Sequence, residues 1–382
     1  MSYKNGYANG LSVDDHAKDA HNLATNGYPN GHGNSFKDQH DSSEVPLAEK
    51  PSSPIVSHPE LHSNLTKVDV DFEHFFLIGK PRRIPPQFTI ELTEHTYLPK
   101  VDNPRRDWVS SVAVPAFLAY RAQNQVRAFA TIGTGAGLDA IGACDIFDLD
   151  QIAVTDIHEG VVDAARRNIC KATAGIGVHL VAATGDLLCP LADHSSAYDL
   201  IYENLPNIPM RPDCAIDDGQ TSATYVLGRT EEIPLVATAN LLALHFLALC
   251  QAKPLLSPNG AVLSSIGGRV CIDILLGMAV DAGYSAKILT YTWKIQSEPE
   301  EVIGGYKKNQ EDGLGPFYFY PVSVLEKTFG CMTPAEAGSK AKEIEATLYQ
   351  HRVDAAVAYD LHANGLIMGH TVVIVQSKPT AM

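Results

Sequence analysis

The sequence predicts an α/β protein with a mostly parallel sheet that helices cover. Between about residues 123 and 297, short runs rich in β-branched residues alternate with helical runs, and this alternation is typical of a parallel sheet. A glycine-rich turn follows the first strand-like run, and acidic or amide residues follow the next ones. Because ligands of open α/β sheets bind at the carboxyl ends of the strands, these turns predict a ligand-binding edge.

The predicted core elements follow one another at short spacing. The strand-like runs span residues 127–133, 151–157, 178–186, 198–204, 260–267 and 285–295, and a last one spans 370–378. The helical runs span residues 137–147, 158–172, 235–256 and 269–283. The sequence therefore divides into a ligand-binding core over residues 123–297 and a final core strand within residues 366–382.

Three further segments differ from the core in composition. Residues 1–65 are rich in Asn, Gly, His and Ser and lack an apolar period, which predicts a disordered tail. Residues 66–122 hold a strand-like and a helical run and are expected to gate the substrate. Residues 298–365 hold the aromatic run Phe317–Tyr320 and a helical run over residues 333–359. This last segment is expected to be an insertion before the final strand.

Length and composition place the chain among ordinary globular proteins. Its 382 residues, 45% of them hydrophobic, suffice for one large domain or two ordinary ones. The longest apolar run, residues 235–256, contains Asn240, His245 and Lys253, so no membrane span is expected. No signal peptide is recognisable, and the scattered cysteines lack a C-x-x-C pair that would suggest zinc. These features predict a cytoplasmic protein without a metal site.

The charge of the chain limits its partners. The formal net charge is −15, and residues 1–65 hold 4 Lys and Arg against 8 Asp and Glu, which leaves −11 on the rest. Nucleic-acid binding needs a dense basic surface, and the basic runs at residues 80–83 and 104–106 are short and isolated. We expect a small-molecule partner and neither nucleic acid nor membrane, while the sequence does not indicate an oligomeric state.

The glycine-rich turn has the spacing of a nucleotide-binding loop. Gly133, Gly135 and Gly137 lie between the first strand-like run and a helical run. Glycine lets the backbone approach a ligand closely, and the start of the helix presents free N–H groups. Turns of this kind also bind NAD and FAD, and a purely structural turn is a further alternative.

Two acids at the next strand ends narrow the choice of ligand. Asp156, followed by Ile157, ends the second strand-like run, where a carboxylate can bond both ribose hydroxyls or cap a helix. Asp186, followed by Leu187, ends the third run, where its carboxylate can bond the exocyclic amine of adenine. Together the three strand ends predict an adenosine-shaped slot.

On these motifs the chain resembles the class I S-adenosylmethionine-dependent methyltransferases, over residues 105–296 and the final strand. The resemblance implies a seven-stranded, mostly parallel Rossmann-like sheet with the last strand antiparallel, and S-adenosylmethionine as the cofactor at its carboxyl edge. One departure concerns Thr131, which stands where the family often has an acid. The methionine amino group of the cofactor therefore needs another partner.

The stretch Glu203-Asn-Leu-Pro-Asn207 resembles the Asn-Leu-Pro-aromatic motif of methyltransferases that act on nitrogen. Asn204 and Leu205 would accept hydrogen bonds from the acceptor nitrogen, Asn204 would also adjoin the cofactor, and Pro206 would fix the turn. Glu203 would add negative charge beside the substrate, or Tyr202 a hydroxyl, since alternation along a strand lets only one of the two face the site. Asn207 stands where an aromatic ring is usual, so a flat, stacked substrate is not favoured. A stiff turn without substrate contact is the alternative interpretation.

Further candidates for substrate binding flank the core. Gly267 to Arg269 and Thr292 to Gln296 look like the methylating region of plant methionine S-methyltransferases, which implies an amino-acid-like substrate. Arg269 would then bind a carboxylate, or it would cap a loop. Asp107 and Trp108 could close over an amine, although Asp107 is equally suited to cap a helix, and Tyr306 is assigned to the substrate or to core packing.

These features together predict N-methylation of a small amine or amino-acid-like metabolite. An amine needs only to arrive neutral, which burial favours, whereas a hydroxyl acceptor would need a base. His158, His179 and His245 are interpreted as structural, so no base is evident. The alternatives are S- or O-methylation of a small metabolite, methylation of a protein side chain, and a non-catalytic cofactor-binding regulatory protein.

Overall fold

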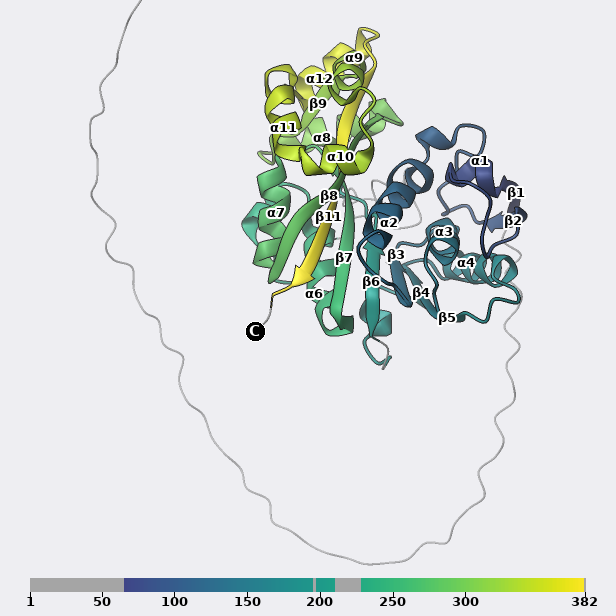
Figure 1. Ribbon diagram of the computed structural model, residues 1–382. Coiled ribbons are helices and arrows are strands. Elements are labelled where there is room, and N and C mark those ends of the chain that lie inside the picture. Colours follow the sequence, from purple (N-terminus) through teal and green to yellow (C-terminus); the bar gives the residue numbers. More distant parts are fainter. Residues whose placement is uncertain (1–64, 195–196, 210–227, 381–382) are drawn as a thin grey trace, which may run out of the picture. The chain divides into compact units, whose positions relative to one another are not determined.

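The computed structural model describes residues 65–194, 197–209 and 228–380 (Figure 1). These residues belong to one compact unit that spans Glu60–Met382. The predicted tail, residues 1–65, lies outside the described residues except for Leu65. Within the described ranges, no helix combines the length and the apolar character needed to cross a membrane.

In the part of the chain that the structure describes, the central sheet contains nine strands. Its order is β10-β9-β11-β7-β6-β3-β4-β5, and β8 pairs with β11. In Figure 1 the last strand, β11, lies between β7 and β8, and it is antiparallel to both. The bounds are β3 (Ala128–Ile132), β4 (Gln151–Asp156), β5 (His179–Thr184), β6 (Tyr198–Glu203), β7 (Leu256–Gly268), β8 (Tyr284–Ile295), β9 (Tyr318–Pro321), β10 (Val353–Asp354) and β11 (Met368–Pro379).

The strand count of the sequence prediction was wrong for the sheet as a whole. Seven strands have the order β5-β4-β3-β6-β7-β11-β8 with β11 antiparallel, as expected for the core. Two more, β9 and β10, come from residues 298–365, and Tyr320 and Pro321 of β9 pair with Gly369 and Met368 of β11. β11 is long enough to pair with core strands over most of its length and with β9 at its start.

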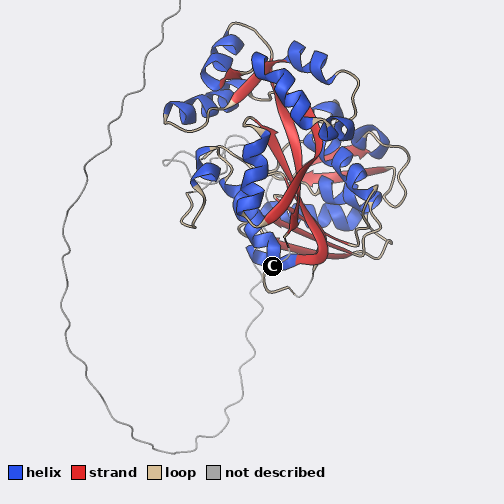
Figure 2. Cartoon of the chain, turned by 60° about the vertical axis from the view of Figure 1, so that its left-hand side comes forward, coloured by secondary structure: helices blue, strands red, loops and turns tan. Residues whose placement is uncertain are grey.

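Apolar residues bury both faces of the core strands. In β6, Leu200 and Tyr202 belong to one apolar cluster and Ile201 to the other, because successive side chains of a strand point to opposite faces. Figure 2 shows helices on both sides of the sheet. The first cluster includes α2 (Val114–Arg121), α3 (Leu138–Ile146) and α4 (Glu159–Ala172), and the second includes α5 (Leu235–Ala239), α6 (Ala243–Ala252) and α7 (Ile272–Asp281).

Two predicted helices are broken in the structure. The run over residues 235–256 forms α5, α6 and a 3-10 turn, with Leu241 in a left-handed conformation between α5 and α6. The run over residues 333–359 is interrupted by β10. Figure 1 shows the helices of this region gathered at one end of β8 and β11. They are α8 (Pro299–Glu311), α9 (Val322–Phe329), α10 (Pro334–Ser339), α11 (Ala341–Leu348) and α12 (Ala355–Ala363).

The N-terminal region forms a small hairpin and a helical approach to the core. β1 (Thr66–Asp71) and β2 (Gln87–Leu92) pair antiparallel, and α1 (Phe72–Phe76) lies between them in sequence. A 3-10 turn at Pro104–Arg106 and a π-helical turn at Val109–Ala113 lead into α2. Pro115 lies at the start of α2, directly after the π-helical turn, where the helical hydrogen-bond pattern is already irregular and a residue without an N–H fits.

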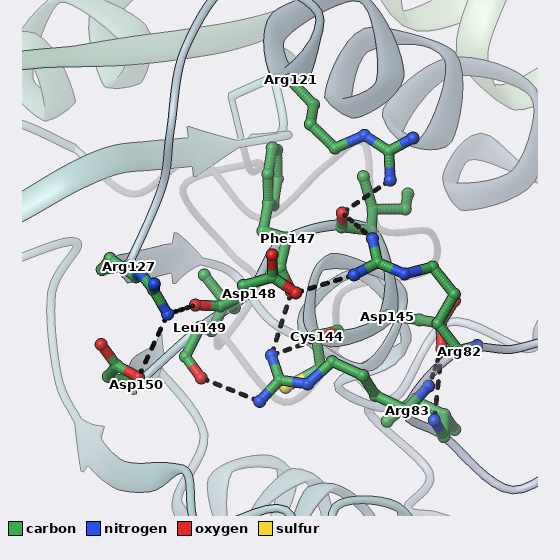
Figure 3. A network of polar contacts seen from close by, with 12 residues as sticks. Arg82, Arg83, Arg121, Arg127, Cys144, Asp145, Phe147, Asp148, Leu149 and Asp150 are labelled. Atoms are coloured by element: carbon green, nitrogen blue, oxygen red, sulfur yellow. Dashed lines mark hydrogen bonds and ion pairs between the residues drawn. The ribbon is translucent and has the colours of Figure 1, made fainter.

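Arginines from this region hold the carboxyl end of α3 (Figure 3). The guanidiniums of Arg83 and Arg121 donate to the carbonyls of Phe147 and Ile146 at 3.0 and 2.9 Å. These carbonyls lack helical partners and carry the negative end of the helix dipole. Arg82 also pairs with the exposed Asp148 at 2.7 Å. The basic run at residues 80–83 therefore has a structural role at the edge of the sheet opposite the glycine-rich turn.

Candidate functional site

Two adjoining cavities lie at the carboxyl edge of the sheet. Cavity A, of about 150 Å³, is bordered by the ends of β3, β4 and β5, and cavity B, of about 220 Å³, is bordered by the ends of β3, β6, β7 and β8 and the start of β11. Residues that border both are Tyr97, Gly133, Gly135, Asn204, Leu205 and Pro206. The glycine-rich turn and the Asn204–Pro206 turn therefore separate the two.

The glycine-rich turn needs glycine for its backbone conformation. Gly133 and Gly135 have φ values of 66° and 52°, a left-handed region that other residues rarely adopt. The N–H of Gly133 donates to the carbonyl of Thr155 at 2.8 Å, which ties the turn to β4. Gly137 was predicted to contact the cofactor, but it borders neither cavity. A Cβ there would lie 3.0 Å from Ile169, so Gly137 instead allows α3 to pack on α4.

Asp156 borders cavity A beside the glycine-rich turn. Its carboxylate accepts hydrogen bonds from the N–H groups of Gly135 at 3.3 Å and His158 at 3.2 Å. Ile157 and His158 also border this cavity, and the His158 ring stacks on His95 at a centroid distance of 4.6 Å. The two histidines form an aromatic wall that the sequence pattern did not indicate.

Asp186 borders the same cavity and carries an arginine partner. Arg229 donates to both carboxylate oxygens of Asp186 at 2.9 and 2.8 Å. Leu187 borders the cavity with a left-handed φ of 48°, so its backbone turns at the cavity wall. Arg229 lies far from Asp186 in sequence and was not predicted as a site residue.

The turn after β6 presents an unbonded amide to both cavities. Asn204 is exposed, and its side chain makes no hydrogen bond within the described ranges. Asn207 borders cavity B, and its side-chain N–H donates to the carbonyl of Leu241 at 2.9 Å. Asn207 therefore anchors the turn to the α5–α6 junction, while Asn204 faces open space.

Glu203 does not reach either cavity, so its predicted contact with substrate was wrong. It shares a sheet face with Ile201 and points toward α6, where its carboxylate lies 2.8 Å from Nδ1 of His245. Both side chains are fully buried. Because side chains alternate along a strand, Tyr202 points the other way and borders cavity B.

Cavity B contains a buried acid that the motif comparison missed. Asp139, in the first turn of α3, accepts hydrogen bonds from the Thr131 hydroxyl and, at 2.8 Å, from the N–H of Ala140. Burial raises the pKa of Asp139 to about 6. Thr131, which replaces the acid expected at the end of β3, thus positions an acid that comes from the following helix. The raised pKa still leaves Asp139 ionised at pH 7.

The far side of cavity B contains a buried arginine. Arg269 is 7% exposed, and its guanidinium donates to Gln296 at 2.7 Å, to His370 at 3.3 Å and to the Tyr306 hydroxyl at 3.5 Å. The Tyr306 ring lies 4.7 Å from the guanidinium carbon. Among the described residues, no carboxylate forms an ion pair with Arg269. Tyr306 therefore touches both the cavity and the arginine that borders it.

Lys294 holds the Asp107–Trp108 segment over cavity B. Its ammonium donates to the carbonyls of Arg106 at 2.8 Å and Asp107 at 3.2 Å and to the Ser111 hydroxyl at 2.9 Å. Desolvation lowers the pKa of Lys294 to about 8. Asp107 accepts the N–H groups of Lys100 and Val109, so it caps the turn and also borders the cavity, as does Trp108.

Comparisons with known proteins give only remote likenesses. No family model matches the chain, and no curated protein matches it. Ribosomal protein L11 methylase from Lactobacillus delbrueckii subsp. bulgaricus is 18% identical, with a TM-score of 0.30, over 46% of this chain and 70% of that one. N-methyltransferase NodS from Bradyrhizobium japonicum WM9 is 11% identical, with a TM-score of 0.32, over 49% and 88%. The YcgJ protein from Bacillus subtilis is 13% identical, with a TM-score of 0.36, over 70% and 98%.

Proposed function

We propose that this protein is an S-adenosylmethionine-dependent methyltransferase that methylates nitrogen in a small amine or amino-acid-like metabolite. The observation that carries the proposal is the turn Asn204–Pro206 at the junction of cavities A and B. Its free amide can bond a nucleophile in cavity B beside a cofactor in cavity A. The strand order and the motifs of the glycine-rich turn support the same function.

The residues of cavity A and the adjoining part of cavity B suit S-adenosylmethionine. Asp156 would bond the ribose hydroxyls, and Asp186 the adenine amine. Asp139 is a buried carboxylate whose hydrogen bonds come only from neutral groups among the described residues, so it suits the methionine ammonium. When bound, the cofactor supplies an electrophilic methyl group on its sulfonium.

The turn would then position the acceptor nitrogen. The side-chain oxygen of Asn204 and the carbonyl of Leu205 would accept its N–H groups and leave the lone pair directed at the methyl group. These acceptors also stabilise the positive charge that the nitrogen gains during transfer. Pro206 limits the conformations of the turn. A neutral amine requires no base for this step, because the lone pair is already available.

The histidine beside the arginine supports nitrogen rather than oxygen as the acceptor. His370 borders cavity B, but its Nε2 accepts a hydrogen bond from Arg269, since a guanidinium can only donate. Nδ1 then carries the proton. His370 therefore has no free acceptor nitrogen with which to deprotonate a hydroxyl.

Transfer of a labelled methyl group to small amines, thioethers, alcohols and peptides tests the proposal. We expect transfer to amines, and Asn204→Ala should lower kcat by about 100-fold or more with a much smaller change in cofactor affinity. Asn364→Ala is the matched control, since Asn364 only caps a helix through the carbonyl of Asp360. Calorimetry that finds no binding of S-adenosylmethionine or S-adenosylhomocysteine would exclude the function, and unchanged turnover in Asn204→Ala would exclude the role of the turn.

A further inference from the structure

The side chain of Arg269 lies where β7 has a glycine, Gly267, and therefore no side chain. Ser265 and Gly267, which alternate along β7, border cavity B, and so does Arg269, the first residue after the strand. A Cβ at Gly267 would lie 2.0 Å from Nη1 of Arg269. The missing side chain at Gly267 therefore leaves the space in which the guanidinium folds back along the strand, toward the turn at Asn204.

The buried charge of Arg269 lacks a carboxylate partner among the described residues. The two buried acids that border the same cavity are bonded elsewhere: Asp107 to backbone N–H groups, and Asp139 to Thr131 and Ala140. Within the described ranges, the guanidinium bonds only neutral groups, and its Nε has no hydrogen-bond partner. A buried charge is costly unless an opposite charge compensates it, so this site favours an anion.

His370 helps to position the arginine without compensating its charge. It is 2% exposed, and burial together with the charges of Arg269 and Lys294 lowers its pKa well below the ordinary value. With Nε2 bonded to Arg269, the neutral ring carries its proton on Nδ1. That nitrogen is buried and has no hydrogen-bond partner among the described residues. His370 therefore holds the guanidinium through Nε2 and, as a neutral ring, leaves the charge of Arg269 for an anion such as a carboxylate.

The anion site lies a short distance from the proposed acceptor site. Glu203 of β6 pairs with Ser264 of β7, so Asn204 is level with Ser265. Gly267 is two residues further along the neighbouring strand, which corresponds to a separation of about 8 Å from ordinary strand dimensions. After allowance for a hydrogen bond at each end, this distance leaves room for a chain of only a few atoms.

From this geometry we infer that the substrate is a short amino carboxylic acid, with its carboxylate on Arg269 and its nitrogen at Asn204. The assignment of the nitrogen rests on the proposed function. Arg269 is the residue that selects this class of substrate. Gln296 is a positioning residue, because it holds Nη2 of Arg269 at 2.7 Å.

A second arginine in the chain provides a matched comparison. Arg352 lies over the rings of Tyr318 and Tyr349, at 4.2 and 3.7 Å, much as Arg269 lies over Tyr306 and Phe319. Arg352 borders neither cavity. If aromatic packing were the whole role of Arg269, the two arginines would respond alike to substitution.

The test compares glycine, β-alanine and 4-aminobutyrate with their primary amides as methyl acceptors. We expect the wild-type protein to prefer at least one acid over its amide by about 30-fold or more in kcat/KM. Arg269→Gln should reduce this preference to about 1. It should lower kcat/KM for the acids and leave kcat/KM for the amides unchanged, because the amides do not use the charge of Arg269. Arg352→Gln should keep the preference.

A second variant keeps the test valid if Arg269→Gln does not fold. Gly267→Ala leaves the charge in the protein but displaces the guanidinium, so it should lower kcat/KM for the acids and spare the amides. A preference for the acids that survives in a folded Arg269→Gln or Gly267→Ala protein overturns the inference. Equal use of acids and amides by the wild-type protein overturns it as well.

A binding measurement separates this inference from the proposed function. Calorimetry with β-alanine in the presence of S-adenosylhomocysteine should show binding to the wild-type protein and loss of binding in Arg269→Gln. Such binding without any methyl transfer supports the carboxylate site and contradicts the methyltransferase function. Methyl transfer to amines without binding of any of the three acids supports the function and contradicts the carboxylate site.

Discussion

Arginines at the two edges of the sheet differ in how their charges are compensated. At the amino edge, Arg82 and Arg83 bond a carboxylate and the carbonyls at the end of α3 (Figure 3). At the carboxyl edge, Arg269 is more deeply buried and bonds only neutral groups within the described residues. A compensated cation stabilises the fold, whereas an uncompensated buried cation costs stability. An uncompensated buried cation such as Arg269 therefore indicates a ligand site.

The largest stability change should come from the amino edge. Asp145 is buried, and one of its carboxylate oxygens accepts the N–H groups of Arg82, Arg83 and Ile84. Asp145→Ala leaves these donors unbonded and should lower the free energy of unfolding by about 3 kcal/mol, measured by urea denaturation. The folded fraction should keep its cofactor affinity. A loss no larger than that of the control Asp148→Ala would contradict the role of Asp145.

Substitution of Asp139 should raise the free energy of unfolding, whereas substitution of Asp145 should lower it. The reason is that the raised pKa of Asp139 opposes folding at neutral pH. Stability from this carboxyl group is fully present below its ordinary pKa of 3.8 and is lost as the pH rises through about 6. At pH 7, Asp139→Asn should therefore raise the free energy of unfolding by about 1–3 kcal/mol. The same variant should weaken S-adenosylmethionine binding, and wild-type affinity should fall as the pH drops below about 6.

The Asp139 prediction is checked by urea denaturation at pH 4 and pH 7 and by calorimetry with the cofactor. The stability gain of Asp139→Asn should be present at pH 7 and absent at pH 4. A variant that is more stable but binds the cofactor as tightly as the wild-type protein would contradict the assignment of the methionine ammonium to Asp139.

Arg269→Met should change stability by about 1 kcal/mol or less, or should raise it, since an apolar side chain of similar length replaces an uncompensated charge. Arg83→Met should destabilise the protein by about 1–2 kcal/mol, because it leaves the carbonyls at the end of α3 without donors. Thermal denaturation of the two variants gives the comparison. If Arg269→Met were the more destabilising substitution, Arg269 would be a structural residue.

The smallest effect is expected where charges are exposed. Arg82 and Asp148 have side-chain exposures of 49% and 62%, and exposed pairs contribute little. Asp148→Asn should lower the free energy of unfolding by no more than about 0.5 kcal/mol, and the difference should shrink in high salt. A loss of stability that persists in high salt would show that Asp148 stabilises the fold by an interaction other than its ion pair with Arg82.

Local patterns predicted the core well. The glycine-rich turn and the alternation of strands and helices depend on residues close in sequence, whereas the seven-stranded sheet with an antiparallel last strand was expected from the resemblance. Two helical runs were predicted too long, because turns such as that at Leu241 and pairing with a distant strand, as in β10, are not visible in local periodicity.

The candidate site was only partly predictable. Asn204, Asp156 and Asp186 follow strands directly, so their place at the carboxyl edge could be read from the sequence. Glu203 was placed on the wrong face, since the pattern did not show which side of β6 meets α6. Lys294 and Gln296 fell within the candidate range Thr292 to Gln296 but were given no individual role. The cavity residues Asp139, Arg229 and His370 were missed, because each reaches the site from a segment whose sequence carries no signal for it.

Identification of the methylated product tests the central claim most directly. S-adenosylmethionine is incubated with the acids and amides of the short amino acid series, and the products are located by mass spectrometry. We predict a methyl group on nitrogen, formed from an acid in preference to its amide and lost in Asn204→Ala. A protein that binds neither S-adenosylmethionine nor S-adenosylhomocysteine, or one that methylates only oxygen or sulfur, would contradict the account.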